Sequence, residues 1–426
     1  MKRFAALWTS VAVVSVGLLV RADAENRELA PADEPADGEA LRRLVEDPSG
    51  PREIRLLNRT YRTTLRITRP LVLRGQPGTT ILGSNVGTVI DVNADDVTLE
   101  HLEVRGSGGR NTTEDAGIKA RGHRVTVKHA FVDSNLFGIA FEECKSCLLE
   151  DSHVRGIDTD LSLRGDGIKL WESDGSTVRR CHMERSRDMV VWYSRHVLLE
   201  DNVVSDSRYG THLMYAHDST VRNTRMVGNI VGIFVMYSGR VRVEGTLLAG
   251  AHGAAGMGIG FKESDAIRLE RNVILSNTAG VYLDRTPRSA AEPVVFERNT
   301  LARNDVGIRF HSSGKGIVFS GNAFRDNITL VAVDGGGDAL SLDIRGNYWS
   351  EYEGYDLDGN GVGDVPFVYS QLSTELTDRH PSLAFFRGTL ALGLVDAVAR
   401  AFPLVGARKL LVDPAPLHKV PEISLQ

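Results

Sequence analysis

Soft metal-ligating side chains recur in one short stretch of this sequence. The six residues GTHLMY at 210–215 return as GIFVMY at 232–237, which gives His212, Met214 and Met236 related positions. Thioether sulfur and imidazole nitrogen suit Cu(I). Neighbouring strands lie about 4.8 Å apart, so one ion could reach all three side chains. Met257, just before Gly258, is a further candidate ligand. The alternative is that the methionines form an adaptable surface for docking a protein.

A second candidate metal site is an acidic loop near the C-terminus. Residues 356–364 read DLDGNGVGD. Four of them match positions 1, 3, 5 and 9 of a calcium loop, namely Asp356, Asp358, Asn360 and Asp364. Phe367 stands where an EF-hand has its bidentate glutamate, and no helical pattern flanks the loop. We therefore expect either a calcium-like site or a turn closed by its own side chains.

Three cysteines are too few, and odd in number, for a disulfide framework. Cys144 and Cys147 form a C-x2-C pair, for which a local disulfide, a metal site and two unrelated thiols are open alternatives. No second C-x2-C or histidine follows at the spacing of a zinc finger.

The element that must position these side chains is a short repeat. A Gly followed by a small or β-branched residue recurs at intervals of 21 to 29 residues between Gly117 and Gly307, with Asp188 filling one place. Two shorter apolar runs follow it in each period, without a helical segment between them. Three short strands in a period of about 22 residues are typical of a parallel β-helix. We therefore expect an all-β chain with one right-handed parallel β-helix over residues 50–370.

Asparagines recur at two positions of this repeat. Asn277 and Asn304 stand three residues before a repeat Gly, and Asn299 and Asn322 share the second position. Asn tolerates turn conformations, and its amide can bond to the same residue one coil away. We expect asparagine ladders at the corners and assign these residues no chemistry.

Strand alternation predicts which side chains of the repeat point outward. Counting the Gly as position 0, positions 1 and 3 are apolar in almost every coil and must face the core. Positions 2 and 4 then face outward, and in four successive coils they are mostly large and apolar, which marks an interface. Besides the candidate copper ligands, these outward residues are Trp171, Val190, Trp192 and Phe234. We expect a partner-binding face here, unless another loop of the chain covers it.

Both ends of the chain depart from the repeat. A basic start, an apolar run and an Ala-Asp-Ala site predict a secretory signal over residues 1–24, with a membrane anchor as the alternative. Residues 25–49 should form a linker and a helical cap, and residues 371–426 a tail. The tail holds an apolar helical pattern at 390–402, which caps the last coil or docks on a partner. Its candidate partner-binding residues are Leu390, Leu394 and Val398.

Charge and carboxylate placement narrow the function classes. The net charge is −5 and no stripe of Lys and Arg stands out, which argues against a nucleic-acid partner. A polysaccharide lyase, epimerase or hydrolase is the enzymatic alternative, and it needs paired carboxylates on one outward face. Asp166, Asp188 and Asp284 are available but scattered over the repeat. We therefore expect no enzyme.

Several runs carry a resemblance to a known family. They are GDGIKLW at 165–171, VWYS at 191–194, RYGTHLMY at 208–215, VGIFVMYS at 231–238 and GMGIGFK at 256–262, with GVYLD at 280–284 and GNYWS at 346–350. Over most of residues 38–412 the chain resembles the NosD family. The resemblance is specific, because a generic β-helix has no reason to repeat Met-Tyr at this phase.

The resemblance implies a periplasmic accessory protein at the inner membrane. The partners it implies are an ABC transporter with a membrane subunit and an ATPase subunit, a copper chaperone lipoprotein, and nitrous oxide reductase. The function it implies is assembly of the catalytic copper–sulfide centre of that reductase. Copper as transient Cu(I) is therefore the expected cargo, while calcium is expected only from the acidic loop.

Overall fold

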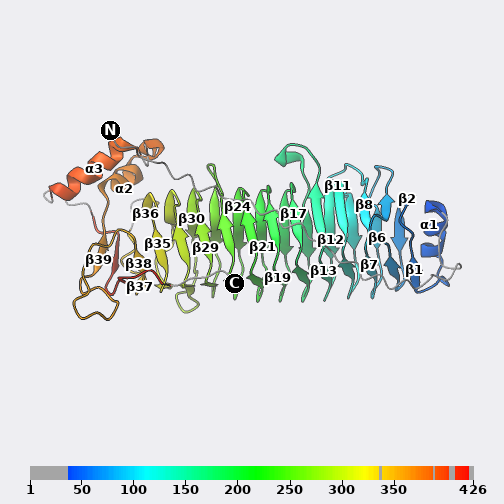
Figure 1. Ribbon diagram of the computed structural model, residues 1–426, viewed down its shortest axis with the longest axis horizontal. Helices are drawn as coiled ribbons and strands as arrows, with labels where there is room; N and C mark the ends of the chain where they lie inside the picture. Colours follow the sequence, from blue (N-terminus) through cyan, green and yellow to red (C-terminus); the bar gives the residue numbers. More distant parts are fainter. Residues whose placement is uncertain (1–36, 335–337, 387–388, 403–407, 422–426) are drawn as a thin grey trace, which may run out of the picture. The chain divides into compact units, whose positions relative to one another are not determined.

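A computed structural model describes residues 37–334, 338–386, 389–402 and 408–421. They all belong to one compact unit. The predicted signal at 1–24 therefore lies outside the described residues. Within them the chain is a parallel β-solenoid, as the repeat predicts, and Figure 1 shows its coils stacked one on the next.

Each coil contributes strands to three parallel sheets. The first sheet contains β1 (Glu53–Arg55), β4 (Val72–Arg74), β7 (Thr98–Glu100), β10 (Thr126–Lys128), β13 (Leu148–Glu150), β16 (Thr177–Arg179), β19 (Leu198–Glu200), β22 (Thr220–Arg222), β25 (Arg242–Glu244), β28 (Arg268–Glu270), β31 (Val294–Glu297), β34 (Ile317–Ser320) and β37 (Asp343–Arg345). The second contains β2 (Thr60–Arg62), β5 (Thr80–Leu82), β8 (Glu103–Arg105), β11 (Phe131–Asn135), β14 (His153–Gly156), β17 (His182–Glu184), β20 (Val203–Ser205), β23 (Arg225–Val227), β26 (Leu247–Ala249), β29 (Val273–Leu275), β32 (Thr300–Ala302), β35 (Ala323–Arg325) and β38 (Tyr348–Trp349). The third contains β3 (Leu65–Ile67), β6 (Ile90–Val92), β9 (Ala116–Ala120), β12 (Phe137–Glu142), β15 (Ile168–Trp171), β18 (Asp188–Trp192), β21 (Tyr209–Met214), β24 (Val231–Met236), β27 (Met257–Lys262), β30 (Ala279–Asp284), β33 (Val306–His311) and β36 (Thr329–Val333).

The core is a stack of alternate side chains from these strands. In the first two sheets the central residue of a three-residue strand is buried, as Val178 of β16 and Met183 of β17 are. The longer strands of the third sheet bury two core residues, such as Ile233 and Val235 of β24. Positions 1 and 3 of the repeat therefore face the core, as predicted.

The corners use the left-handed backbone region. Tyr193, Tyr215 and Tyr237 follow three strands of the third sheet with φ of 50°, 53° and 50°. Their rings stack from coil to coil, with centroids 4.9 and 5.2 Å apart. Repeated stacking offsets part of the cost of the left-handed conformation at a residue with a Cβ.

The predicted asparagine ladders are confirmed. In the first, Nδ2 of Asn272, Asn299 and Asn322 donates to Oδ1 of the next asparagine over 2.9, 3.0 and 2.9 Å, ending at Asn347. A second ladder, over 3.0 and 2.9 Å, joins Asn277, Asn304 and Asn327. Each rung also donates to a main-chain carbonyl, as Asn299 does to Leu269 over 3.0 Å, so buried polar groups at these corners are satisfied.

The two ends of the stack are covered differently. At its start α1 (Gly38–Glu46) places Leu41 and Val45 in the core, and the Asp37 side chain caps its first turn. At the other end β39 (Phe367–Tyr369) pairs antiparallel with β40 (Leu411–Asp413). The short helices η2 (Leu161–Leu163), α2 (Leu372–Arg379), η3 (Pro381–Phe386) and α3 (Leu390–Ala401) complete the described elements. No helix in the described part of the chain is long and apolar enough to span a membrane.

Candidate functional site

The predicted outward column lies on the third sheet, with its residues in register. Trp171, Trp192, Met214 and Met236 are successive partners on β15, β18, β21 and β24. Beside them, Val190 pairs with His212 and His212 with Phe234. The structure therefore brings His212, Met214 and Met236 onto one face of two adjacent strands, as the repeat predicts.

His212 is the centre of this group, which we call the His212 cluster: His212, Trp192, Tyr209, Met214, Phe234 and Met236. The imidazole Nε2 lies 3.2 Å from Met236 Sδ, and Nδ1 accepts a hydrogen bond from Trp192 Nε1 over 3.4 Å. Aromatic rings close the remaining sides, with Tyr209 at 4.9 Å and Phe234 at 6.2 Å between centroids. Only 8% of His212 is exposed.

These surroundings determine the protonation state and the tautomer of His212. Burial lowers the pKa of His212 to about 4, because the charged imidazolium is poorly solvated there. Asp188 opposes this shift, and Arg208 adds to it. The imidazole is therefore neutral at ordinary pH, as metal ligation requires. Since Trp192 donates to Nδ1, the resting tautomer carries its hydrogen on Nε2, facing the Met236 sulfur.

Tyr209 was not predicted as part of this site. An ion pair with a buried carboxylate holds it: Asp188 accepts from Arg208 Nε over 3.0 Å and from the Tyr209 main-chain N–H over 3.2 Å. The Arg208 guanidinium lies over the Tyr209 ring at 4.8 Å. The sequence held a weak signal, because the residue before the repeat Gly is Val231 in the next coil but the aromatic Tyr209 here.

Two residues predicted for the site, Val190 and Met257, do not take the expected part in it. Val190 is fully buried, because the longer side chains of its partners Lys169 and His212 enclose it, so its prediction as a partner-contacting residue is wrong. Met257 lies one coil beyond Phe234, beside Gly260, where a Cβ would collide with both Met257 and Phe234. Met257 thus borders the His212 cluster without joining His212.

A groove continues from the cluster along the third sheet. Its volume is about 780 Å³, and Phe234, Met236 and Met257 line its apolar end. Its far end is polar, where Asp334 accepts from Arg309 Nε over 3.0 Å and lies 3.0 Å from His311 Nδ1. The groove therefore joins a soft-ligand end to a charged end.

The carboxylates considered for catalysis are engaged in ion pairs. Asp166 accepts from Arg187 over 2.9 Å, and Asp188 is held by Arg208. Burial raises the pKa of Asp166, against the lowering effect of Arg187. Asp284, on a later coil, lies 3.8 Å from the Lys262 ammonium. Each of these three carboxylates therefore already has a cationic partner, and the charge of Asp188 adds to the raised pKa of Asp166.

The acidic loop closes on itself. The Asp356 carboxylate accepts from the main-chain N–H groups of Gly359, Asn360 and Gly361 over 2.8, 3.1 and 2.9 Å. These bonds lower the pKa of Asp356, although burial acts in the opposite direction. Leu357 N–H donates to Asp364 over 2.7 Å, and Asn360 Nδ2 to Asp358 over 2.8 Å. The calcium expectation for this loop stays a prediction.

A disulfide joins Cys144 and Cys147, which is one of the three alternatives for the C-x2-C pair. Cys181 is a free thiol buried in the core, and burial raises its pKa to about 12. These sulfurs are therefore structural, and none of them belongs to the His212 cluster.

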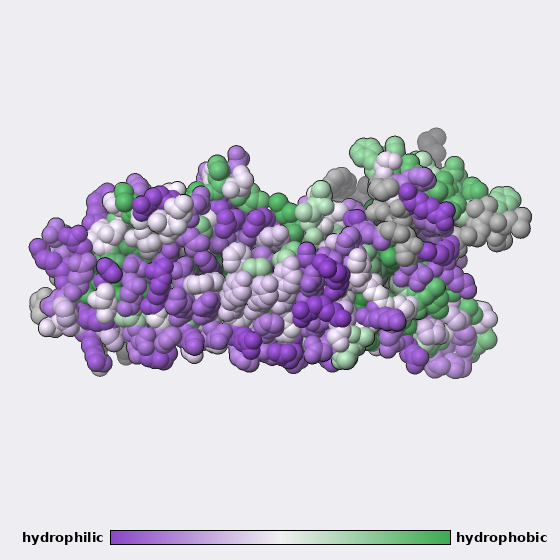
Figure 2. Space-filling model, turned by 180° about the vertical axis from the view of Figure 1, so that it is seen from behind, coloured by the Kyte–Doolittle hydropathy of each residue, from purple (hydrophilic) through white to green (hydrophobic). Residues whose placement is uncertain are grey.

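The C-terminal helix α3 presents an apolar stripe. Leu390, Leu394 and Val398 lie one turn apart and are 95%, 66% and 47% exposed. The opposite side of α3 is held by Asp396, which accepts from the Ser373 N–H and hydroxyl of α2 over 2.8 and 2.6 Å. Figure 2 shows hydrophobic side chains gathered over these helices, against largely hydrophilic coils. The stripe faces solvent, while Gly393 and Asp396 on another side of α3 line a hollow with Ile328 and Thr329 of the last coil, so capping and docking both stay predictions.

Comparison with known proteins identifies a matching family model and two similar proteins. Residues 151–354 match the family model "Periplasmic copper-binding protein (NosD)", a segment that contains the whole His212 cluster. A curated relative from Pseudomonas aeruginosa, "Probable ABC transporter binding protein NosD", is 28% identical, over 91% of this chain and 92% of its own. Its namesake from Stutzerimonas stutzeri is 25% identical, over 91% of each.

Solved structures share the architecture. The A-module of a mannuronan C-5 epimerase from Azotobacter vinelandii is 14% identical with a TM-score of 0.55, covering 73% of this chain and 96% of its own. The N-terminal fragment of gene product 12 of bacteriophage Phi29 is 13% identical with a TM-score of 0.50, covering 72% and 69%. At these identities the likeness shows the fold alone.

Proposed function

From the premise that residues 151–354 belong to the NosD family, we propose that this protein is a periplasmic accessory protein that holds Cu(I) in transit to nitrous oxide reductase. The observation that carries the proposal is the 3.2 Å approach of His212 Nε2 to Met236 Sδ inside an aromatic enclosure. Copper is cargo in this proposal, destined for the copper–sulfide centre of the reductase.

The donor set fits a soft monovalent ion. Thioether sulfur favours Cu(I), and a neutral imidazole supplies a nitrogen lone pair without competition from a proton. Ligation at Nε2 moves the imidazole hydrogen to Nδ1, where it meets the Trp192 N–H, so Trp192 must turn aside when copper binds. Met214 and Met236 are half-buried, so a partner can reach the sulfur atoms from outside. Easy entry and exit suit a carrier.

The proposed partners follow from the family and from α3. An ABC transporter, through its membrane subunit and its ATPase subunit, would hold the protein at the inner membrane. A copper chaperone lipoprotein would deliver the ion, and the reductase would receive it. The exposed stripe of Leu390, Leu394 and Val398 supports the transporter contact, because a protein seldom leaves such a stripe uncovered without a partner.

Cu(I) competition titration of the purified chain tests the copper proposal. Replacing Met214 and Met236 together by Leu keeps the apolar volume, at a cost of about 1 kcal/mol, and removes both sulfur atoms. We expect the double variant to fold, to lose Cu(I) affinity by at least about tenfold, and to leave co-expressed reductase without its catalytic copper centre. Unchanged affinity together with full copper loading of the reductase would contradict the proposal.

The matched control is Met226→Leu. Met226 lies on β23 beside the same coil, but its side chain faces the core and is 1% exposed. This variant also exchanges sulfur for carbon inside the solenoid, so any general effect of the substitution appears in it. We expect its Cu(I) affinity to equal that of the wild type.

The second candidate is a sugar-active enzyme, favoured by the charged end of the groove. Tyr282, Arg309 and His311 line it with Asp334, and an acidic sugar would meet both cations and carboxylates there. Assay on acidic polysaccharides separates the candidates, since turnover would favour the enzyme. We expect none, because Asp334 is already paired with Arg309.

A further inference from the structure

Imidazole and carboxylate groups gather on the second sheet, away from the His212 cluster. His153 begins β14 and His182 begins β17, and the two residues are register partners. Their rings stack with centroids 4.6 Å apart and planes 9° apart. Glu184 stands two residues after His182 and therefore faces the same side. Its Oε1 lies 3.1 Å from His153 Nε2.

These three side chains already have the spacing of ligands around one ion. One ligand atom from each lies within 4.8 Å of the others. Two ligands at about 2.0–2.1 Å on a tetrahedral ion stand roughly 3.3 Å apart, close to the separation of His153 Nε2 and Glu184 Oε1. All three residues are half-buried, so the group is open to solvent on one side, unlike a closed structural site.

The neighbouring charges leave Glu184 available for a cation. Arg155, the register partner of Glu184, donates from Nε to Asp133 over 2.7 Å, and its charge acts on Glu184 without a direct ion pair. Among the described residues the ion-pair partner of Glu184 is His153, which is charged only when protonated. A cation bound here would pair directly with the Glu184 carboxylate.

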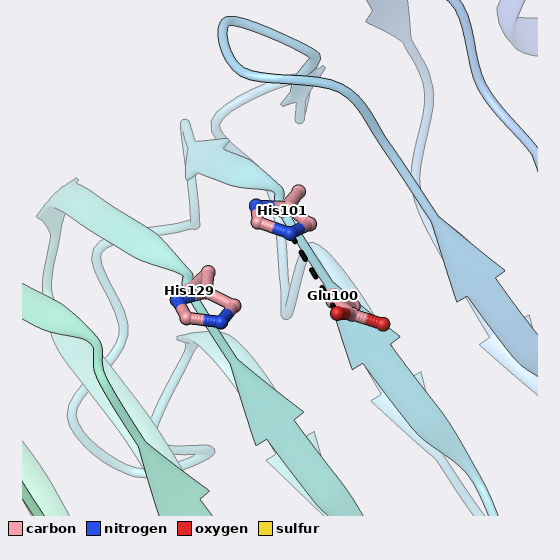
Figure 3. Close-up of side chains that lie close together, drawn as sticks. All are labelled: Glu100, His101 and His129. Carbon is pink, nitrogen blue, oxygen red and sulfur yellow. Dashed lines mark ion pairs between the residues drawn. The ribbon is translucent and has the colours of Figure 1, made fainter. Parts of the chain in front are cut away.

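A similar group of histidines and a glutamate lies at a neighbouring corner, and there an arginine neutralises the glutamate charge. Figure 3 draws Glu100, His101 and His129, whose imidazoles also stack at 4.6 Å. Here Glu100 Oε1 lies 3.6 Å from His101 Nε2, while Oε2 is 3.3 Å from the Arg74 guanidinium. His129 is exposed. The Arg74 charge repels an incoming cation, so this group has the same ligand types with weaker attraction.

We propose that His153, His182 and Glu184 bind one divalent first-row transition-metal ion, Cu(II) or Zn(II), with the remaining coordination positions open to water. Imidazole and carboxylate ligands suit these borderline ions, and Cu(II) binds most tightly in the divalent series. The group contains no sulfur, so it differs in metal preference from the His212 cluster. The protein would then hold oxidised and reduced copper at different faces.

Equilibrium dialysis against Zn(II), on the full chain purified without a polyhistidine tag, tests this proposal. His182→Phe keeps a ring stacked on His153 and removes the ligand nitrogen. We expect this variant to retain its melting temperature and to lose Zn(II) affinity by at least about tenfold. Glu184→Gln should also lose affinity while keeping a hydrogen-bond partner for His153. With Cu(II), electron paramagnetic resonance should show nitrogen coupling that His182→Phe reduces.

His129→Phe is the matched control, because it makes the same exchange in the group of Figure 3. We expect it to bind Zn(II) like the wild type. If His182→Phe and Glu184→Gln bind Zn(II) as the wild type does, or if only His129→Phe loses the ion, the proposal is overturned and the His153 and His182 rings simply stack. Cu(I) titration of His182→Phe should remain unchanged, which separates this outcome from failure of the His212 proposal.

Discussion

The protonation state of His212 links stability to pH. Its pKa is about 4 in the folded protein, against roughly 6.5 in an unfolded chain. Between these values the unfolded chain binds more protons, so acidification favours unfolding there. The contribution of the neutral imidazole is complete above pH 6.5 and is lost by about pH 4. A shift of this size corresponds to about 3 kcal/mol.

The expected outcome is a pH-dependent difference between the wild type and His212→Phe. The phenyl ring fills the same enclosure of Trp192, Tyr209 and Phe234 but does not titrate. On acidification from pH 7 to 4.5, the melting temperature of the wild type should fall further than that of the variant. Parallel curves for the two proteins would show that His212 does not titrate as its burial indicates.

The candidate ligands were predictable from sequence, but their enclosure was not. Alternation along a strand and a repeat of 22 residues fix the face and register of His212, Met214 and Met236. Neither rule gives burial on an outward face, which depends on the size of neighbours in adjacent coils. This is why Val190 is enclosed and why Tyr209 was missed. The repeat could have predicted that His153 stacks on His182. The pair was missed because polar residues on the surface do not stand out in a pattern of apolar side chains.

At the scale of an element, α3 is expected to act through its exposed stripe. Leu390→Gln with Leu394→Gln changes side chains that are 95% and 66% exposed, so stability should move by no more than about 0.5 kcal/mol. The double variant should lose co-purification with the transporter, because its apolar contact surface is gone. Leu357→Gln, at an 81% exposed position outside α3, is the control and should co-purify normally.

Co-purification of the α3 variant at wild-type level would contradict docking through this stripe. Point substitution is the sharper experiment, because a truncation ahead of α3 also deletes β40. Asp413 of β40 is fully buried and accepts from Asn347 N–H over 2.9 Å and from Trp349 Nε1 over 3.0 Å. The sequence predicted the apolar helix. The pairing of β39 with β40 was not, because no repeat connects segments so far apart.

At the scale of the whole molecule, each coil is stabilised by its two neighbours. Asn299→Ala removes one rung of the first asparagine ladder and leaves buried groups of Asn272 and Leu269 without their bonds, at a cost of roughly 3 kcal/mol. Hydrogen exchange should show lost protection in the coils around β28, β31 and β34. Protection of distant β10 and β13 should stay unchanged, and a uniform loss over all coils would contradict nearest-neighbour stabilisation.

The architecture as a whole was the most predictable feature. The Gly period fixes the phase of every coil, and the Asn positions fix the corners, because both signals recur and reinforce one another. The end of the solenoid carries no such recurrence. Asp413 terminates the first ladder by accepting from Asn347 Nδ2 over 3.2 Å, and one aspartate in a tail gives no pattern to detect.

The antiparallel pair of β39 and β40 determines how the solenoid bears mechanical load. The chain leaves β39 at Tyr369 and re-enters β40 at Leu411, its register partner. A force applied to α3 therefore unzips this pair from that end, beginning with the bond from Leu410 N–H to the Tyr369 carbonyl. The hydrogen bonds of this pair break one at a time, and those at Asp413 break last. We therefore expect a pull on α3 to open this pair before it disturbs the register of the coils around His212.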